Sequence, residues 1–421
     1  MTAEICMMNR LAVVLAADSA TTVSRWVDGK REERYFKGAN KIFQISDMQP
    51  VGLMIYDSAD ILNVPWELIV KSFRAHITGK SFNTVAEYAR ELFTFLCDNP
   101  RFFPDDIQRE KLVEAVRGVL FEWLGAAIDG VEEGDQRAAI EAFLLRKTDD
   151  ALSQEAPDCL EAAHIDKIAV DVNDEVNQVL RDILGLLNVH DLTDTDQYAF
   201  AAVHEVIKNA SSYLDTTGLV FAGFGDHEIF PAVIEFESQG VVGGRHIFGK
   251  KSDVALDHRT PAWMKAFAQT EMVDTFHAGF SFDAYSSIMV EVGQTLSTFA
   301  EQVAVQSGGD FAAIDDVDGL VHAAREKIGS GIIDKAKKEH SLPLRRVLGV
   351  LPANEMAEIA ETLITLQSLK EKVTKPSETV GGPVDVAIIT KHEGLVWVKR
   401  KHFFSSDLNS RFKLRLAAQH S

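Results

Sequence analysis

Cysteine is scarce in this chain, with Cys6, Cys97 and Cys159 the only three among 421 residues. Their number is odd and they show no metal-binding spacing, so a disulfide framework or a zinc cluster is disfavoured. Proline is also rare, with 11 residues, whereas hydrophobic residues make up 46% of the chain. This composition indicates a folded protein with an ample core in a reducing compartment.

Long apolar runs are missing as well, since none reaches the ~18 residues needed to span a bilayer. The run at residues 11–17 follows Arg10, as the core of a secretory signal would. It is short for that role, and Glu4 weakens the basic region before it. A β-hairpin accounts for the same residues better, so we expect a cytoplasmic protein that makes no membrane contact.

Basic residues are outnumbered, with 43 Lys and Arg against 63 Asp and Glu and a formal net charge of −20. A negative field of this size repels phosphate backbones and anionic lipids. We therefore expect no nucleic-acid partner. The length corresponds to two or three domains at ~150 residues per domain.

Signals for cofactors and metals are also absent. The three His-Glu pairs lack the second histidine of a zinc-binding helix. Residues 244–250 are similar to a phosphate loop, but Lys251 stands where a Ser or Thr must reach Mg²⁺. We expect no cofactor and no metal.

The first 45 residues carry the clearest pattern of the chain. Short apolar runs broken by turn residues are typical of paired β-strands. The runs at residues 3–8 and 11–17 predict a tight hairpin, and residues 41–45 predict a third strand after a polar connection at residues 27–40. Residues 51–56 predict a fourth strand of the same small antiparallel sheet.

Three polar residues stand where these strands begin or end, namely Thr2, Asp18 and Lys41. In an antiparallel hairpin the start of one strand lies beside the end of the next. We therefore expect Thr2 and Asp18 to lie close together.

This pattern resembles the proteasome β-subunit and its bacterial ring-protease relatives, which are N-terminal-nucleophile (Ntn) hydrolases. In that family an N-terminal Thr is the nucleophile, an acidic residue follows a strand like residues 13–17, and a Lys precedes a strand like residues 42–45. Removal of Met1, which is usual before a small second residue, makes Thr2 the first residue and gives it the family's spacing to Asp18. Lys41 matches the catalytic Lys when several extra residues are allowed in the loop before it.

The resemblance implies an α+β fold, a four-layer αββα sandwich with two sheets between layers of helices. We expect residues 1–99 to form its first half and residues 196–421 its second half. Residues 100–195 have charged helical patterns that the family lacks, and they predict a helical insertion. The insertion is expected to thicken a layer or make a subunit contact rather than form an independent catalytic domain.

The second half is predicted to begin with strands at residues 219–225, 230–236 and 240–248, with a turn at residues 237–240. Helical patterns dominate after residue 262. A long amphipathic helix at about residues 355–371 precedes a final hairpin. Proteasome subunits likewise end with a long helix, a Gly-rich connection and a strand, so the resemblance extends to both ends of the chain.

The resemblance also implies a mechanism. The Thr2 hydroxyl would be the nucleophile and its free α-amine the base, because an amine pKa near ~7.7–8.0 leaves part of it unprotonated at neutral pH. Lys41 would favour the alkoxide, and Asp18 would hold Lys41 in place. Backbone N–H groups at Tyr56 and Asp57 would bind the oxyanion.

Departures from the family keep other functions open. The family carries Gly at the turn where this chain has Tyr56 and Asp57, and a basic residue where it has Ala20. Its accessory Asp and Ser fall near Ser377 and Val380, so the acidic member is missing unless Glu378 substitutes for it.

The leading function is an N-terminal threonine hydrolase that cleaves amide or peptide bonds through an acyl-enzyme on Thr2. The alternatives are a catalytically inactive proteasome-like scaffold, or an Ntn amidase or acyltransferase acting on a small molecule. The partners implied are a peptide or amide substrate and further copies of the chain in a homo-oligomer.

Overall fold

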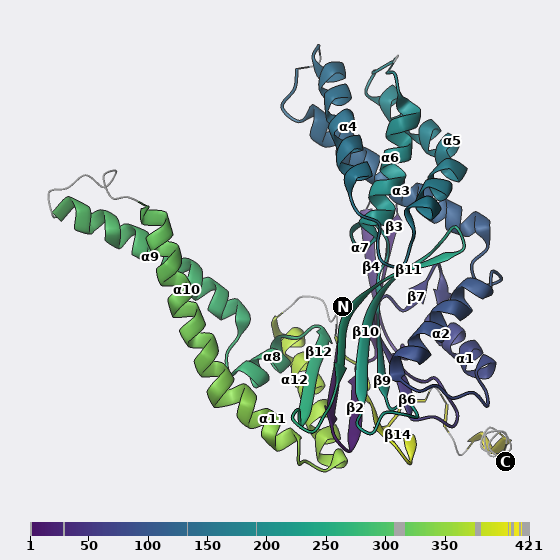
Figure 1. Ribbon diagram of the computed structural model, residues 1–421, viewed down its shortest axis with the longest axis vertical. Helices are drawn as coiled ribbons and strands as arrows, with labels where there is room; N and C mark the ends of the chain where they lie inside the picture. Colours follow the sequence, from purple (N-terminus) through teal and green to yellow (C-terminus); the bar gives the residue numbers. More distant parts are fainter. Residues whose placement is uncertain are drawn as a thin grey trace. The chain divides into compact units, whose positions relative to one another are not determined.

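The computed structural model describes residues 2–27, 30–132, 134–190, 192–306, 316–374, 380–402, 404–405, 408–411 and 414. The protein is mixed α+β (Figure 1). It divides into a first unit, Met1–Ile42 with Leu256–Ser421, and a second unit, Phe43–Ala255. In the described residues, no helix combines the length and the apolar character needed to cross a membrane.

The first unit is built on a five-stranded antiparallel sheet. Its strands, in spatial order, are β12 (Ala262–Ala268), β1 (Ala3–Asn9), β2 (Ala12–Ala17), β13 (Asp385–Thr390) and β14 (Gly394–Lys399). Every residue of β1 and β2 is buried. The two central strands therefore read as continuous apolar runs rather than as alternating ones, with Glu4 and the terminal Asn9 as exceptions.

Helix α12 (Ala353–Thr374) packs on this sheet. Met356, Ala360 and Leu363 recur at helical spacing and join the same buried cluster as Ile5 and Val386. The predicted amphipathic helix and final hairpin therefore both form.

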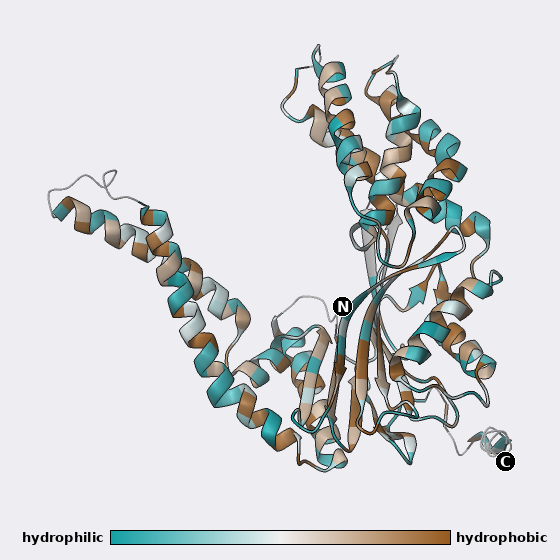
Figure 2. Ribbon diagram, viewed as in Figure 1, coloured by the Kyte–Doolittle hydropathy of each residue, from teal (hydrophilic) through white to brown (hydrophobic). Residues whose placement is uncertain are grey.

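The remaining helices of the first unit are α8 (Glu271–Ala278), α9 (Phe282–Gln306), α10 (Val317–Ala336), the π-helical turn η2 (Lys337–Ser341) and α11 (Leu342–Leu348). Helices α9 and α10 run side by side (Figure 1). Only Met289, Gly293 and Ala304 of α9 are buried, and Figure 2 shows hydrophobic residues interspersed with hydrophilic ones along the helix.

Two predictions for the first unit are wrong. The supposed polar connection at residues 27–40 contains strand β4 (Lys30–Lys37), which pairs with β3 (Ala20–Val27) in a hairpin. Residues 262–268, at the start of the region where helical patterns were expected to dominate, form β12 and pair with β1 from Ala3↔Ala268 to Asn9↔Ala262. In both cases pairing with a neighbouring strand outweighs a weak local signal.

The second unit contains another five-stranded sheet. Its order is β11 (Arg245–Ala255), β10 (Ala232–Val242), β9 (Thr217–Gly223), β6 (Val51–Asp57) and β5 (Ile42–Gln44). Helices α1 (Trp66–His76) and α2 (Val85–Asp98) contribute Trp66, Phe73 and Leu92 to a core that also contains Leu53 and Phe221. The short strands β7 (Asp60–Ile61) and β8 (Val64–Pro65) precede α1.

A separate helical core lies in the same unit. It is formed by α3 (Asp105–Ile128), α4 (Gln136–Ser153), α5 (Ala162–Leu186), α6 (Thr195–Lys208) and the single turn α7 (Ala210–Tyr213). Trp123, Leu144, Leu180 and Val203 are buried within it. The region predicted as a helical insertion is thus helical, and α4 and α5 extend into residues 149–164, which were expected to be irregular.

The turn predicted at residues 237–240 is also wrong. Strand β10 runs through it with an irregularity between Ser238 and Gly240, and the hairpin turns at Gly243 and Gly244. These two glycines have φ values of 57° and 73°, as a tight two-residue hairpin turn requires. The signal was misassigned because a bulge and a turn both attract glycine.

Candidate functional site

The β1–β2 hairpin brings the beginning of β1 next to Asp18. The Asp18 backbone N–H donates to the Ala3 carbonyl at 3.1 Å, and the Ala3 N–H donates to Asp18 Oδ1 at 3.2 Å. The Thr2 carbonyl accepts a hydrogen bond from the backbone N–H of Gln269, just after β12, at 2.9 Å. Thr2 is therefore held between two neighbouring strands and is only 3% exposed.

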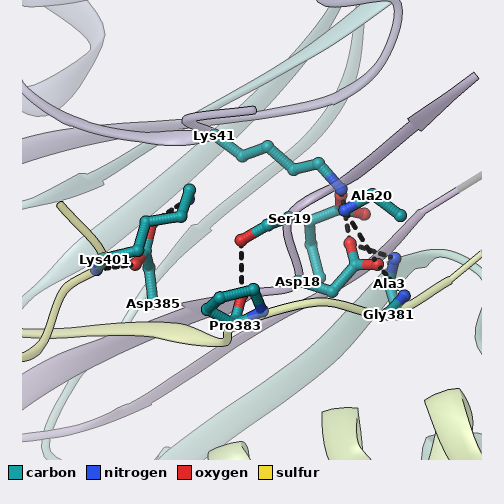
Figure 3. A network of polar contacts seen from close by, with 10 residues as sticks. Ala3, Asp18, Ser19, Ala20, Lys41, Gly381, Pro383, Asp385 and Lys401 are labelled. Atoms are coloured by element: carbon teal, nitrogen blue, oxygen red, sulfur yellow. Dashed lines mark hydrogen bonds and ion pairs between the residues drawn. The ribbon is translucent and has the colours of Figure 1, made fainter. Parts of the chain in front are cut away.

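Lys41 enters this site from the chain segment before β5. Its Nζ donates to Asp18 Oδ1 (Figure 3) and lies 3.1 Å from Glu4 Oε1. The Lys41 side chain is 5% exposed, and both carboxyl partners are fully buried. The structure thus places the ammonium between two carboxyl groups inside the first unit.

Asp18 is fixed by several further donors. Its Oδ2 accepts from the backbone N–H of Gly381 at 2.7 Å and from that of Ala20 at 3.4 Å. Together with Ala3 and Lys41, these groups surround the carboxylate (Figure 3). Such a set of donors fixes the orientation in which Asp18 meets Lys41.

The loop before β13 completes this support. Ser19 donates through its hydroxyl to the Pro383 carbonyl and through its N–H to the Gly381 carbonyl at 3.2 Å. Gly382 has φ of 84°, and a Cβ there would lie 3.1 Å from the Cβ of Lys37 and 3.4 Å from that of Ser19. A side chain at Gly382 would crowd this contact and strain the backbone.

Glu4 is the site residue that the sequence interpretation missed. It is fully buried, and burial raises the pKa of its carboxyl to about 7, with the Lys41 ammonium opposing the rise and the Asp18 charge adding to it. The available signal was its position: Glu4 is the single charged residue of a largely apolar strand and lies two residues from Thr2. Alternate strand residues share a face, so Thr2 and Glu4 point the same way.

The Thr2 hydroxyl is not locked by a strong bond. Its Oγ1 is buried and makes no hydrogen bond of ordinary geometry with any described residue, although the hydroxyl lies near enough to the Glu4 carboxyl to lower the pKa of Glu4 slightly. The oxygen is therefore available to react, or to pair with a group that exchanges a proton with it.

Tyr56 and Asp57, the expected oxyanion residues, belong to the second unit, where they end β6. The Tyr56 hydroxyl donates to Glu235 Oε1 at 2.8 Å, and its ring lies over Gly218. Asp57 has φ of 64°, a left-handed conformation that favours glycine, the residue that the family carries at this turn. Ser377 and Glu378, the expected accessory pair, and Met1 lie outside the described residues.

The cluster can stabilise or repel negative charge at Thr2 according to the state of Glu4. With a proton on Glu4, one carboxylate balances the Lys41 ammonium. With Glu4 ionised, the cluster carries a net negative charge, which disfavours an alkoxide at Thr2.

Across the described parts of the chain, no group of three or more His, Cys, Asp or Glu side chains is arranged to hold a metal ion. Comparison of the chain with protein-family models and with curated proteins gives no match. The case for a function therefore depends on the geometry of the Thr2, Glu4, Asp18 and Lys41 cluster.

Proposed function

We propose that the protein is an N-terminal threonine hydrolase that cleaves amide or peptide bonds. The observation that carries this proposal is the buried Lys41 ammonium, held by Asp18 and Glu4 at the strand end where Thr2 lies. A buried ion cluster is costly to maintain, so its place beside an unbonded hydroxyl supports a chemical role.

In the proposed reaction, removal of everything before Thr2 frees its α-amine. The amine nitrogen takes the Oγ1 proton as Oγ1 bonds to the substrate carbonyl carbon. The tetrahedral intermediate then loses its C–N bond, and the proton passes to the leaving nitrogen. Water, deprotonated by the same amine, attacks the resulting ester, releases the acid and restores Thr2.

Lys41 contributes charge to these steps. Its ammonium favours the alkoxide of Thr2 and lowers the pKa of the nearby amine by like-charge repulsion. Asp18 keeps Lys41 in position through their hydrogen bond.

The proposal includes the four-layer αββα arrangement, a cytoplasmic location and self-association. The arrangement is supported by two five-stranded sheets, each with its own packed helices, and by the complete burial of β1 and β2. The location is supported by three cysteines that form no disulfide. Self-association is supported by large exposed apolar side chains on α9, including Phe299 and Val305.

The direct test combines intact mass with covalent labelling. We expect the mass of the purified protein to begin at Thr2, and a peptide epoxyketone, which reacts with both the hydroxyl and the free amine, to add to Thr2. Thr2→Ala should abolish labelling, and the exposed-site control Thr94→Ala should label fully. Retention of Met1 together with no labelling would instead support the inactive scaffold, a function favoured by the near-complete burial of Thr2.

A further inference from the structure

A cleft of about 510 Å³ lies entirely within the second unit, apart from the Thr2 site. Its walls come from the β7–β8 turn, from α3, from the segment before β9 and from the irregular stretch of β10. This volume is typical of sites for small molecules.

The irregularity in β10 shapes one wall. Ser238 pairs with Phe248 and Gly240 with Ile247, so Gln239 between them has no opposite residue on β11. The extra residue turns Ser238, Gln239 and Gly240 toward the cleft, where all three form part of the lining. Gly240 permits this path with φ of 108°.

Gln239 is the most informative residue of the wall. Its side chain makes no hydrogen bond with any residue that the structure describes, although the residue is only 8% exposed. Its amide atoms are not sealed from solvent, so they open onto the cleft. Its carbonyl and N–H₂ groups are therefore free to bind a molecule in the cleft.

The charges around the cleft indicate that the bound molecule is positively charged. Asp60, Glu122 and Asp215 line it without an ion-pair partner among the described residues, and Lys111, the cation of the lining, lies 2.8 Å from Glu114. Asp60 and Asp215 both line the cleft, and burial and then the Asp215 charge raise the pKa of Asp60, while the Lys111 charge opposes the rise. An entering cation would relieve this repulsion without breaking an ion pair.

The same geometry argues against a metal ion. In the portion of the chain that is described, these carboxylates belong to no cluster of metal-ligand type, because they are spread over different walls. An organic cation is long enough to reach carboxylates on different walls of the cleft, and it can also hydrogen-bond to the Gln239 amide.

We propose that this cleft binds a small organic cation with an amino or guanidinium group, held by Asp60, Asp215 and the Gln239 amide. The site is independent of the proposed hydrolase activity, since none of its residues belongs to the Thr2 cluster.

The test is calorimetric titration of the full chain with agmatine at ~0.15 M salt, where unspecific attraction to an acidic protein is screened. We expect saturable one-site binding, and no binding of 1,4-butanediol, which lacks charge. Gln239→Leu and Asp215→Asn should each weaken binding about tenfold or more. Asp215 is exposed, so its variant tests the site even if Gln239→Leu fails to fold.

Asp149→Asn is the matched control, because it removes the same charge from an exposed position of α4 outside the cleft. It should leave the affinity within twofold of the original. Equal weakening by Asp149→Asn and Asp215→Asn would show general charge attraction and overturn the proposal. So would the absence of agmatine binding, or Mg²⁺ binding that depends on Asp215 in its place.

Discussion

In the first unit, Lys41 lies between the carboxyl groups of Asp18 and Glu4, whereas in the second unit the buried Ser238 hydroxyl meets the buried ring of His246 at 2.7 Å. All five residues are buried; Glu4, Ser238 and His246 lie on strands, and Asp18 and Lys41 lie directly beside strand ends. Burial lowers the pKa of His246 to about 3, so this second pair is neutral at physiological pH.

The difference in charge suggests that the neutral pair has a structural role and the ion cluster a chemical one. A neutral hydrogen-bonded pair buries polar atoms at lower cost than an ion cluster, although His246 Nδ1 makes no hydrogen bond with the described residues. The His246 ring also packs 4.7 Å from the ring of Phe93, measured between centroids. A buried ion cluster contributes little net stability compared with apolar residues of the same volume. The first unit nevertheless keeps its ions, which is consistent with a need for charge at Thr2.

The largest effect should follow loss of the ammonium. Lys41→Met leaves Asp18 and Glu4 buried without their cation, and we expect the free energy of unfolding to fall by about 3–5 kcal/mol. Lys71→Met removes an exposed ammonium from an i,i+4 pair and should cost less than about 0.5 kcal/mol. Denaturant titration of both variants checks this, and equal losses would contradict a stabilising role for the buried charge.

The next effect concerns the partner of Lys41. Asp18→Asn keeps the shape of the side chain but removes its negative charge. That charge accepts hydrogen bonds from Lys41 and from the backbone N–H groups of Ala3 and Gly381. We expect a loss of about 1.5–3 kcal/mol in unfolding free energy, the range for hydrogen bonds to charged groups. Labelling of Thr2 should slow as well, because Lys41 is no longer held. An unchanged labelling rate would remove Asp18 from the proposed mechanism.

Stability should depend on pH through Glu4. Its pKa is about 7 in the folded protein and lower when unfolded, so the folded state binds more protons between these values. The contribution is fully present below about pH 4.5 and is lost as pH rises through about 7, at up to about 1 kcal/mol per pH unit. Glu4→Gln should flatten this decline when unfolding is measured from pH 5 to 8. A slope identical to that of the original chain would show that Glu4 does not titrate in this range.

The neutral pair should give the opposite slope. His246 has a lower pKa in the folded protein than in the unfolded one, so its contribution is present above about pH 6.5 and is lost as pH falls toward 3. His246→Phe keeps a ring beside Phe93 and should remove this acid sensitivity at a cost of about 1 kcal/mol near neutral pH. Unfolding midpoints between pH 4 and 7 provide the measurement. Persistence of the full acid sensitivity in the variant would assign it to other groups.

The smallest effect on stability should come from the proposed nucleophile. Thr2→Ala removes a buried hydroxyl that makes no hydrogen bond of ordinary geometry with the described residues, so the free energy of unfolding should change by less than about 1 kcal/mol. Labelling should nevertheless be lost completely. A large loss of stability would show that the hydroxyl stabilises the fold. The polar residues of both units would then have structural roles.

Local pattern was sufficient for several parts of this molecule. The apolar runs of β1 and β2 and the turn between them placed Thr2 near Asp18, because strand period and antiparallel pairing are short-range properties. Helix α12 and the β13–β14 hairpin were predictable for the same reason. The strand β12 and the bulge at Gln239 were not, since a strand's partner and a bulge's register depend on residues far along the chain.

The same division holds within the candidate site. Thr2, Asp18 and Lys41, and their positions at strand ends, could be predicted from the sequence. The burial of Glu4 beside Lys41 and the Gly381 N–H that binds Asp18 emerged only from the folded chain. The electrostatic environment of a charged group depends on which other groups are buried with it. In this site those groups come from segments more than 300 positions apart in the sequence, as Asp18 and Gly381 are.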